Sequence, residues 1–432
     1  MTAAATARRP NSRELALTVI RDVFGPEERG AHAAFDARAR KTDLDARDRA
    51  FAAELAYGTI KQRRLLDWYL GPYLTGRDKP LPPAIQEILR LGVYQLRMLS
   101  GVDVHAAVYE TVNLALRHGH KGTAGLVNAV LRRFIADARP PPHPSDFDDL
   151  DHYLGTAYSV PTWIAAHLGA VFGDLREPIL SGINAAPQHA LRVNALRSTI
   201  PDAVSALEAG GAHVRPSPLV AESLVVLSGQ ANDDPQGRWT IQGETACVPV
   251  DVLAPQRGET VLDLCSGRGN KSVQAAARMD DCGQLICVEI ESKKTKLLHE
   301  NLERAGVTCA AVVEGDVRRV VLPEADAVLL DAPCSGLGIL GRHPEARWRK
   351  SPDDGERLAV LQSDLLAAAA QRVKPGGRLV YSVCSSDPRE GLEVSGAFLG
   401  GHPQFARAAS DLLIPPGLEG RDGFYVAYLT RT

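Results

Sequence analysis

In the stretch Thr260-Val261-Leu262-Asp263-Leu264-Cys265-Ser266-Gly267-Arg268-Gly269-Asn270-Lys271, an apolar run passes through a turn of small residues into a helix. The run Thr260–Leu264 predicts a buried strand, and residues 271–279 have the periodicity of a helix. Small residues in the turn let backbone N–H groups approach a ligand, and the start of the helix favours negative charge. A strand, a glycine turn and a helix in this order predict the first unit of an α/β fold.

Strands and helices keep alternating through the rest of the chain. Further strands are predicted at 284–289, 310–314, 327–330 and 377–382, helices at about 292–304 and 355–373, and a final β-rich piece at 423–429. This alternation predicts a mostly parallel, Rossmann-like sheet, which we expect to form a domain over residues 237–432. In such sheets ligands bind at the carboxyl ends of the strands.

The first half of the chain has a different pattern. Residues 11 to about 137 carry apolar positions at helical spacing, which predicts an all-α bundle. A Pro-rich run at 139–144 predicts a stiff linker, and a mixed helical and β-like segment follows from about 150 to 235. We therefore expect a multidomain chain, with a helical domain over 1–140 and a small α+β module over 145–236 before the α/β domain.

The composition indicates the cellular compartment of the protein and bears on which partners it can bind. All seven cysteines lie at or after Cys247, and their odd number without a Cys-x-x-Cys pair argues against a disulfide scaffold and against zinc. No apolar run approaches the roughly 18 residues of a membrane span, and residues 1–10, expected to be a tail, lack the apolar core of a signal peptide. These features predict a cytoplasmic protein without a metal. The net charge of −3 leaves open whether a nucleic acid binds.

Two cysteines follow predicted strands and lie in segments suited to chemistry. Cys334 ends the run Val328-Leu329-Leu330-Asp331-Ala332-Pro333-Cys334, and Cys384 ends the run Leu379-Val380-Tyr381-Ser382-Val383-Cys384. Because parallel strands end at one edge of a sheet, the two thiols can serve one reaction. Asp331 is expected to hydrogen-bond a nucleobase, with Pro333 making the loop rigid. The alternative, a small buried hydrophobe, is favoured for Cys247, Cys282, Cys287 and Cys309, while Cys265 stays undecided.

Acidic residues after the next two strands point to an adenosine-containing ligand. Glu289 ends the second strand, where an acidic residue accepts hydrogen bonds from ribose hydroxyls, and Asp316 follows the third. The alternatives are a helix-capping carboxylate for Glu289 and a turn cap for Asp316. Together with the glycine turn, both are expected to bind this ligand, alongside the loop residues Leu264, Cys265, Ser266, Gly267, Arg268, Gly269, Asn270 and Lys271.

A basic segment with a tryptophan lies directly after the first cysteine motif. Positive charge and an aromatic ring beside a candidate active site suit RNA phosphates and stacked bases. The alternative is a solvated loop with a packed tryptophan. The residues expected to contact RNA are Arg342, His343, Arg347, Trp348 and Arg349.

Both cysteine segments resemble the catalytic motifs of a known enzyme family. Residues 331–336 with Arg342-His343-Pro344, and residues 381–385, closely resemble the two catalytic motifs of bacterial RNA cytosine-5 methyltransferases. Residues 422–425 resemble the last motif of that family, and residues 192–194 resemble the segment before its methyltransferase core.

The N-terminal half narrows the resemblance to one type within this family. Residues 125–132 are similar to part of the RNA-binding domain of the NusB type. Over nearly its whole length, the chain resembles the Sun/Fmu type of 16S rRNA methyltransferase, which joins a NusB-like domain to a class I methyltransferase domain.

Two departures from the family pattern stand out. Where the family reads Cys-Ala-Ala-Pro-Gly-Gly-Lys-Thr, this chain has Arg268 in place of the proline and Asn270 in place of a glycine. The chain also lacks the asparagine that usually follows the position of Glu390. Neither departure removes a group that the chemistry requires.

The resemblance implies S-adenosylmethionine as methyl donor and a cytosine of 16S rRNA, unassembled or in early assembly, as acceptor. It assigns Cys384 as the nucleophile at C6 of the base and Cys334 as the thiol that assists loss of the C5 proton and release. Asp331 would hold the base and also contact the cofactor, where Lys271 would join Glu289 and Asp316.

Other functions are weighed beside this one. The same chemistry on tRNA is the first alternative, and an RNA-binding assembly factor without catalysis is the second. The presence of both cysteines with Asp331 and Lys271 argues against the second. A thiol redox protein would carry paired cysteines close in sequence, which are absent. The sequence leaves the oligomeric state open.

Overall fold

The computed structural model describes residues 11–75 and 80–432, which form two compact units. The first unit contains the described residues up to Ala166 together with the distant segment His343–Arg349. The second contains His167–Arg342 and Lys350–Thr432. The predicted N-terminal tail, residues 1–10, lies outside the described residues.

The first unit is helical, which confirms the predicted all-α half. Its helices pack around a shared apolar core that includes Leu17, Ile60 and Leu131. Side-chain caps begin several of them, since Asn11 accepts from the Glu14 N–H and Asp103 from the Ala106 N–H. The helices are α1 (Ser12–Val23), α2 (Ala31–Ala39), α3 (Ala46–Lys61), α4 (Arg63–Leu74), α5 (Pro83–Met98), α6 (Val104–Arg117), α7 (Lys121–Asp137) and α8 (Leu150–Ala157).

Helix α9 (Thr162–Phe172) leads into the second unit, which begins with a small antiparallel sheet. The strand order is β2-β3-β1-β4, and helix α11 (Ile200–Ala209) packs on the sheet through Ala203 and Leu207. This module confirms the predicted mixture of helix and strand. Its elements are α10 (Arg176–Gly182), β1 (Ala190–Val193), β2 (His213–Pro216), β3 (Ser223–Ser228) and β4 (Trp239–Ile241).

A large sheet fills the rest of the second unit, with the order β10-β12-β9-β8-β5-β6-β7 and β11 beside β12. Strands β5 to β9 run parallel, and β12 runs antiparallel to β9. Several predicted strands are confirmed within a residue or two. The strands are β5 (Thr260–Leu264), β6 (Gln284–Glu289), β7 (Ala310–Glu314), β8 (Ala325–Asp331), β9 (Val373–Val383), β10 (Phe405–Arg407), β11 (Leu412–Ile414) and β12 (Phe424–Arg431).

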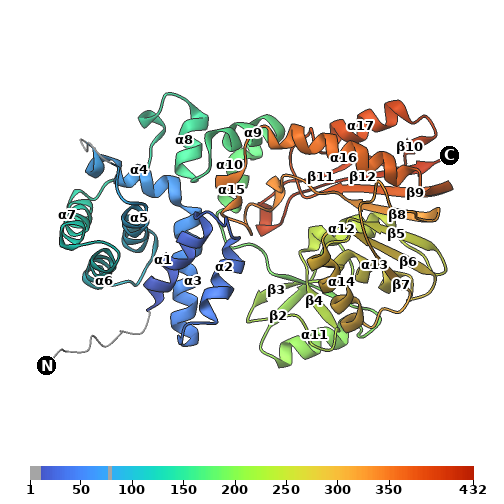
Figure 1. Cartoon of the computed structure of the whole chain (residues 1–432), viewed down its shortest axis with the longest axis horizontal. Helices are drawn as coiled ribbons and strands as arrows, with labels where there is room; N and C mark the ends of the chain where they lie inside the picture. The colour runs from blue at the N-terminus through green and yellow to red at the C-terminus, as the bar shows by residue number, and fades with distance from the viewer. Residues whose placement is uncertain (1–10, 76–79) are drawn as a thin grey trace. The chain divides into compact units, whose positions relative to one another are not determined.

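Helices cover both faces of this sheet (Figure 1). Side chains alternate along β5, so Val261 packs with the first group of helices and Leu262 with the second. The first group is α12 (Glu244–Leu253), α13 (Asn270–Arg278) and α14 (Ser292–Ala305), and the second is α16 (Asp354–Ala370) and α17 (Leu392–Gly401). The predicted Rossmann-like architecture is thereby confirmed.

The strand order places a switch point beside β5. The chain adds β6 and β7 on one side of β5 and then returns to place β8 on the other side. Ligands of open α/β sheets bind at such a point, outside the carboxyl ends of the strands. The ends of β5, β8 and β9 therefore define where a site is expected.

Candidate active site

The two cysteines singled out in the sequence meet at the carboxyl ends of β8 and β9. Their sulfur atoms lie 3.2 Å apart, and both residues are partly exposed. Strand register explains the meeting, because Asp331 of β8 pairs with Ser382 of β9. Cys334 follows Asp331 by three residues, and Cys384 follows Ser382 by two, so the two cysteines stay close together. Fifty positions of sequence separate the thiols, and parallel pairing of neighbouring strands removes that separation.

The surroundings of the pair hold the proton on Cys334. A hydrogen bond to the Cys384 sulfur, burial and the charge of that sulfur, in this order, raise the pKa of Cys334 well above its usual value. The charge of Glu390 adds to this effect. In the free protein, Cys334 therefore keeps its proton.

Lys271 and Asp331 form an ion pair at the switch point. The Lys271 Nζ lies 2.6 Å from Asp331 Oδ2, and the Ser382 hydroxyl donates to Asp331 Oδ1 at 2.8 Å. Burial lowers the pKa of Lys271, but the charge and hydrogen bond of Asp331 outweigh it, so the net pKa is raised. The lysine also lies 5.4 Å from the centre of the Phe424 ring. A fixed cation and a fixed carboxylate thus stand beside the thiols.

The predicted cofactor loop is held by Glu289, which the sequence singled out, and by Arg192 and Asn301, to which the sequence assigned no role. The Gly267 N–H donates to Glu289 Oε2 at 2.8 Å. Arg192 donates to the Asn270 carbonyl at 3.2 Å, and Asn301 donates to the Arg268 carbonyl at 2.8 Å. These contacts fix the turn at the two positions where the family has proline and glycine. The backbone at both departures from the family pattern is therefore held by side chains outside the loop.

Glycine is required at the end of this loop. Gly269 has a φ of +83°, and a Cβ atom there would lie 2.3 Å from Leu298 Cδ1. It precedes Asn270, the first residue of α13, so the turn enters the helix with no side chain in the way.

Negative charge gathers around Cys265, at the end of β5. Burial raises the pKa of its thiol to about 12, and four carboxylates add to the shift. In decreasing order of effect they are Asp331, Glu289, Asp263 and Asp316. A thiol that keeps its proton in this field is not a nucleophile, and the predicted contact of Cys265 with the cofactor stays a prediction. The same field favours a positively charged ligand.

Glu289 and Asp316 both have partners within the protein. Glu289 is buried and also accepts from the Glu291 N–H at 2.8 Å, directly before α14 begins at Ser292. The Arg318 guanidinium and backbone N–H hold Asp316 and lower its pKa to about 2. Asp316 therefore makes the contacts expected of a turn cap, which is the alternative to adenine binding. Its predicted role at an adenine stays a prediction.

The last sequence motif packs against the first cysteine loop. Gly338 donates to the Cys384 carbonyl at 3.0 Å, and Gly423 donates to the Gly338 carbonyl at 2.8 Å. A Cβ atom at Gly338 would lie 2.1 Å from the Gly423 oxygen. Gly391 stands where the family has asparagine, and a Cβ there would lie 2.7 Å from the Tyr425 ring. The tyrosine therefore explains the second departure.

The basic segment belongs to the helical unit. Arg347 is fully buried and donates to the Ser159 carbonyl at 3.2 Å, while the Trp348 indole donates to the Ile60 carbonyl at 2.7 Å. Arg349 donates to backbone carbonyls of the helical unit at 2.6 and 2.7 Å. A fully buried guanidinium does not reach a phosphate, so these contacts favour the packed-tryptophan alternative over RNA contact.

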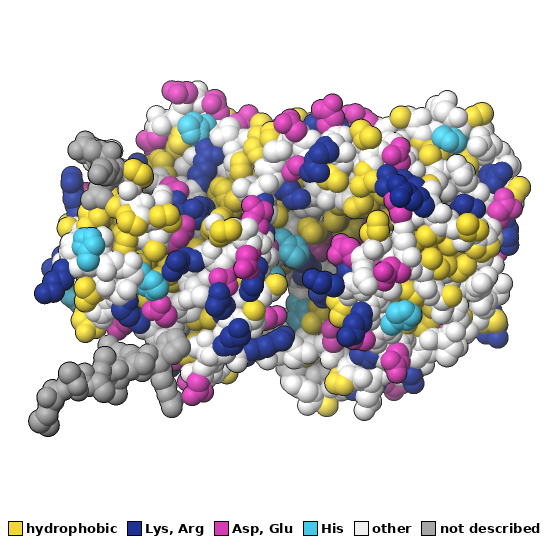
Figure 2. Space-filling view, viewed as in Figure 1, with side chains coloured by type: hydrophobic (Ala, Val, Ile, Leu, Met, Phe, Trp, Pro, Cys, Tyr) yellow, Lys and Arg dark blue, Asp and Glu magenta, His cyan; other side chains and the backbone are white. Residues whose placement is uncertain are grey.

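The two residues at the start of this segment differ from the rest. Arg342, in the second unit, forms an ion pair with Asp422 at 2.6 Å. His343 is exposed, and its predicted contact with RNA stays a prediction. Figure 2 shows basic and acidic side chains interspersed on the visible face, with no large area of one sign.

Sequence reasoning missed two residues near the site. Glu390 is wholly buried and accepts hydrogen bonds from the loops that carry both cysteines. Only its place in the second cysteine motif could have drawn attention to it. Ile290 follows Glu289 and is 63% exposed, which leaves an apolar side chain beside the predicted ribose contact. An isolated isoleucine at a strand end gives no such signal in the sequence.

Among residues 11–75 and 80–432, no helix combines the length and the apolar character that crossing a bilayer requires. Within the same residues, no group of three or more His, Cys, Asp or Glu side chains has the geometry to hold a metal ion.

Comparison with protein families divides the chain into three matching parts. The model for 16S rRNA methyltransferase RsmB/F matches residues 250–430. The NusB family matches residues 10–136, and the ferredoxin-like domain of RsmF/B-like methyltransferases matches residues 160–232.

Curated relatives are similar over nearly the whole length. Ribosomal RNA small subunit methyltransferase B of Thermus thermophilus is 35% identical, with 97% of each chain covered. A probable ribosomal RNA small subunit methyltransferase B of Bacillus subtilis is 32% identical over 91% of this chain and 92% of its own.

Solved structures agree on the fold. The crystal structure of PH0851 superposes with a TM-score of 0.81 and 25% identity over 97% of this chain and 98% of that one. A methyltransferase homologue from Pyrococcus horikoshii is 22% identical, with a TM-score of 0.59, over 67% of this chain and all of its own. At that identity the likeness concerns the fold alone.

Proposed function

This chain belongs to the 16S rRNA methyltransferase RsmB/F family, and we propose that it transfers a methyl group from S-adenosylmethionine to C5 of a cytosine in 16S rRNA. One observation carries the proposal. Two cysteine sulfurs lie 3.2 Å apart at a sheet edge, beside a lysine–aspartate pair at the switch point. That arrangement suits a reaction in which one thiol bonds to a base while the other handles a proton.

The residues at the end of β5 fit this donor. Glu289 ends β6, where a carboxylate would accept hydrogen bonds from ribose hydroxyls, and Ile290 offers an apolar surface for a flat base. Gly267 and Gly269 have positive φ angles and no side chains at two positions of the loop. The carboxylates around Cys265 favour a cation over an anion. When bound, S-adenosylmethionine supplies an electrophilic methyl group on a positively charged sulfonium.

Asp331 and Lys271 would polarise the cytosine. A carboxyl group at Asp331 can bond N3 and the exocyclic amine of the base, and protonation at N3 draws electrons from the ring. The Lys271 Nζ lies 2.6 Å from Asp331 Oδ2 and fixes this carboxylate. C6 of the base then becomes open to attack by sulfur.

The two thiols would divide the covalent steps. The Cys384 thiolate adds to C6, and the displaced double-bond electrons form an electron-rich C4–C5 enamine. C5 would then bond the donor methyl carbon as the bond from that carbon to the donor sulfur breaks, with S-adenosylhomocysteine as the leaving group. Cys334, as thiolate, then takes the proton from C5. The electrons of that C–H bond restore the C5–C6 double bond, and the sulfur of Cys384 leaves as a thiolate.

The electrostatics of the pair support this order. Two of the causes that keep the proton on Cys334, its hydrogen bond to Cys384 and the charge of that sulfur, come from one neighbour. Both weaken once the Cys384 sulfur is bonded to carbon. Cys334 therefore loses its proton more easily when a base is needed.

The target base must reach these sulfurs. C6 of a stacked cytosine is hidden, so we infer that the nucleotide is unpaired or turned out of its helix before attack. This requirement suits RNA that is not yet fully assembled into the ribosomal subunit.

Replacing each cysteine tests the division of roles. We expect Cys384→Ala to abolish methyl transfer and any covalent RNA adduct, because no nucleophile remains to add at C6. Cys334→Ala should still form the adduct and accept the labelled methyl group, but stall at release. A labelled protein–RNA species that survives a denaturing gel is the readout. The roles are reversed if Cys384→Ala accumulates that species and Cys334→Ala does not.

The choice of RNA needs a separate experiment. Protein-free 16S rRNA and tRNA are each incubated with the enzyme and labelled donor, and the product is mapped. Methylation of a cytosine in 16S rRNA supports the proposal, whereas methylation of tRNA alone supports the first alternative. If neither RNA is labelled and no adduct forms, the assembly-factor reading replaces it.

A further inference from the structure

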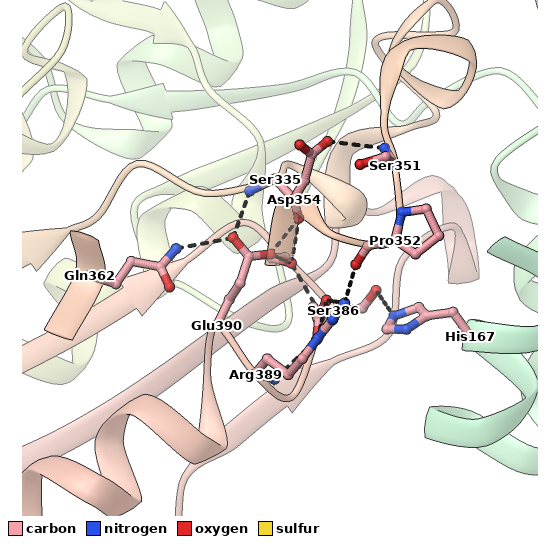
Figure 3. Close-up of polar contacts among 11 residues, drawn as sticks. His167, Ser335, Ser351, Pro352, Asp354, Gln362, Ser386, Arg389 and Glu390 are labelled. Atoms are coloured by element: carbon pink, nitrogen blue, oxygen red, sulfur yellow. Dashed lines mark hydrogen bonds and ion pairs between the residues drawn. The ribbon is translucent and has the colours of Figure 1, made fainter. Parts of the chain in front are cut away.

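We propose that Glu390 is a positioning residue that fixes the two thiols of the proposed reaction at their working separation. Its carboxylate links the loop after Cys334 to the loop after Cys384 (Figure 3). The inference rests on the proposed function, because it assigns a role within the same site. Glu390 itself contacts neither sulfur through a hydrogen bond described in the structure.

Each carboxylate oxygen of Glu390 receives hydrogen bonds from the cysteine loops or beside them. Oε1 accepts from the Ser335 N–H at 2.7 Å and from Gln362 of α16 at 3.0 Å. Oε2 accepts from the hydroxyl of Ser335 and, at 2.5 Å, from that of Ser385. Ser335 and Ser385 are the residues that directly follow Cys334 and Cys384. One side chain thus holds the chain just beyond both sulfurs.

The position of Glu390 is itself fixed on several sides. The Tyr381 hydroxyl of β9 donates to the Glu390 carbonyl. Gln362 also donates to the Pro333 carbonyl at 2.9 Å, so the same amide touches the first cysteine loop and the carboxylate. The side chain of Glu390 has no exposed surface. Water therefore does not compete for these hydrogen bonds, and the carboxylate acts as a rigid tie.

The turn before Glu390 is braced in the same way. Asp387 accepts from the Arg389 backbone and guanidinium, and Arg389 donates to the Pro352 carbonyl at 2.7 Å. His167 of α9 lies 3.2 Å from the Ser386 hydroxyl. The segment from Ser386 to Glu390 therefore has little freedom to move the carboxylate.

Burying a carboxylate that has no cationic partner at hydrogen-bond distance costs free energy of folding, so stability alone does not explain this residue. Among the described residues, the hydrogen bonds to Glu390 come from neutral donors, namely backbone, hydroxyl and amide groups. A neutral glutamine would fill the same space. However, its amide nitrogen would face donors where an acceptor is needed, so one loop would lose its hold.

The test uses Glu390→Gln in the full-length protein. We expect turnover on 16S rRNA to fall about 100-fold, the scale for displacing a reacting group by about 1 Å. The Michaelis constant for RNA and the affinity for S-adenosylhomocysteine should stay within about twofold. The methylated protein–RNA species should accumulate as with Cys334→Ala, because Cys334 no longer reaches the C5 proton.

A second readout needs neither cofactor nor RNA. Diamide, a diazene oxidant, takes the two thiol hydrogens and leaves a disulfide between Cys334 and Cys384, itself being reduced to the hydrazine. Disulfide formation requires the sulfurs to close from 3.2 Å to a bond of about 2 Å. We expect the initial rate of this cross-link, followed by mass spectrometry, to fall at least fivefold in Glu390→Gln.

Glu244→Gln is the matched control. Glu244 is as buried as Glu390 and accepts from Ser217 and Arg421, away from the cysteine loops. It should lower stability without slowing the cross-link or accumulating adduct. If Glu390→Gln does not fold, Ser335→Ala tests the positioning role instead, because it removes one hydroxyl that donates to the Glu390 carboxylate. It should shift both readouts in the same direction by a smaller factor.

The possible results distinguish a failure of the positioning role of Glu390 from a failure of the proposed covalent methyl transfer. The positioning role is overturned if Glu390→Gln cross-links and turns over like the wild type while Cys334→Ala accumulates adduct. It is also overturned if Glu244→Gln reproduces the effects of Glu390→Gln. If Cys334→Ala and Cys384→Ala form no adduct and methylate normally, the covalent function fails, whatever Glu390 does to the cross-link.

Discussion

At the scale of single residues, the site holds ionisable side chains that are buried away from water. Asp263, within β5, is the most extreme case, because only 1% of its surface is exposed. Ser272 donates to its Oδ2 at 2.5 Å, whereas Oδ1 has no hydrogen-bond partner among the described residues. Burial raises the pKa of this carboxyl to about 7, and the charges of Asp331 and Glu289 add to the shift. Near neutral pH it is poised between its neutral and charged forms.

Asp263→Asn should remove a pH dependence of stability. The pKa of Asp263 is raised to about 7 in the folded chain, whereas an unfolded aspartate titrates near 3.9. Its stabilising effect is therefore complete below about pH 4 and is lost as the pH rises toward 7. Relative to the variant, the wild type should lose on the order of 2–4 kcal/mol of unfolding free energy between pH 4 and 7. Urea denaturation at both pH values measures this, and equal pH profiles would contradict the burial argument.

At the scale of elements, the segment His343–Arg349 connects β8 to α16 in sequence but packs within the helical unit. Trp348 packs against the apolar core of that unit, and its indole donates to the Ile60 carbonyl. Burial lowers the pKa of Arg347, and Glu345 opposes the effect. Basic residues that looked suited to RNA are thus engaged in structural contacts.

Trp348→Ala should therefore lower stability by about 2–4 kcal/mol, from lost packing and one lost hydrogen bond. Arg349→Ala should also destabilise, yet leave the salt dependence of RNA binding unchanged. Arg357→Ala, at a highly exposed position, is the control for both. Denaturant unfolding and RNA titrations at several salt concentrations provide the measurements. A log–log slope flatter by about 0.7–0.9 for Arg349→Ala would instead show a phosphate contact.

At the scale of the whole molecule, the family model and the compact units divide the chain differently. The RsmB/F model covers residues 250–430 without interruption, but the helical unit takes His343–Arg349 from within that range. The NusB-type resemblance predicts that the helical domain over 1–140 binds RNA, and this prediction must be tested without exposing this segment. Removing the helices would uncover Trp348 and take away the carbonyl partners of Arg349.

A fragment of residues 145–432 should bind S-adenosylhomocysteine but methylate 16S rRNA poorly. The same fragment with Trp348→Ser is the matched control, because it removes the newly exposed apolar ring. Calorimetry measures cofactor binding, and light scattering reports aggregation. If the Trp348→Ser fragment is soluble and as active as the full-length chain, the helical half has no docking role. If it stays soluble but inactive on RNA, docking is supported.

Much of the fold was readable from local pattern. The strands at 260–264, 284–289 and 310–314 were predicted to the residue. The first two are continuous apolar runs inside the parallel sheet, whereas the third is the partly exposed edge strand β7. Cys334 and Cys384 could be matched to each other because both follow strands, and strand ends of a parallel sheet meet at one edge. Hydrophobic periodicity and strand-end chemistry are properties of short segments, so the sequence alone determines them.

Tertiary structure alone decided which side chains complete the site. Glu390, Arg192 and Asn301 hold the loops through contacts that span from 5 to 78 positions of sequence, and no local pattern encodes such partners. Arg347 and Trp348 have the composition of an RNA-binding loop, but folding buries the arginine and packs the tryptophan. Composition reports the chemistry a side chain can perform, whereas burial decides whether any ligand can reach it.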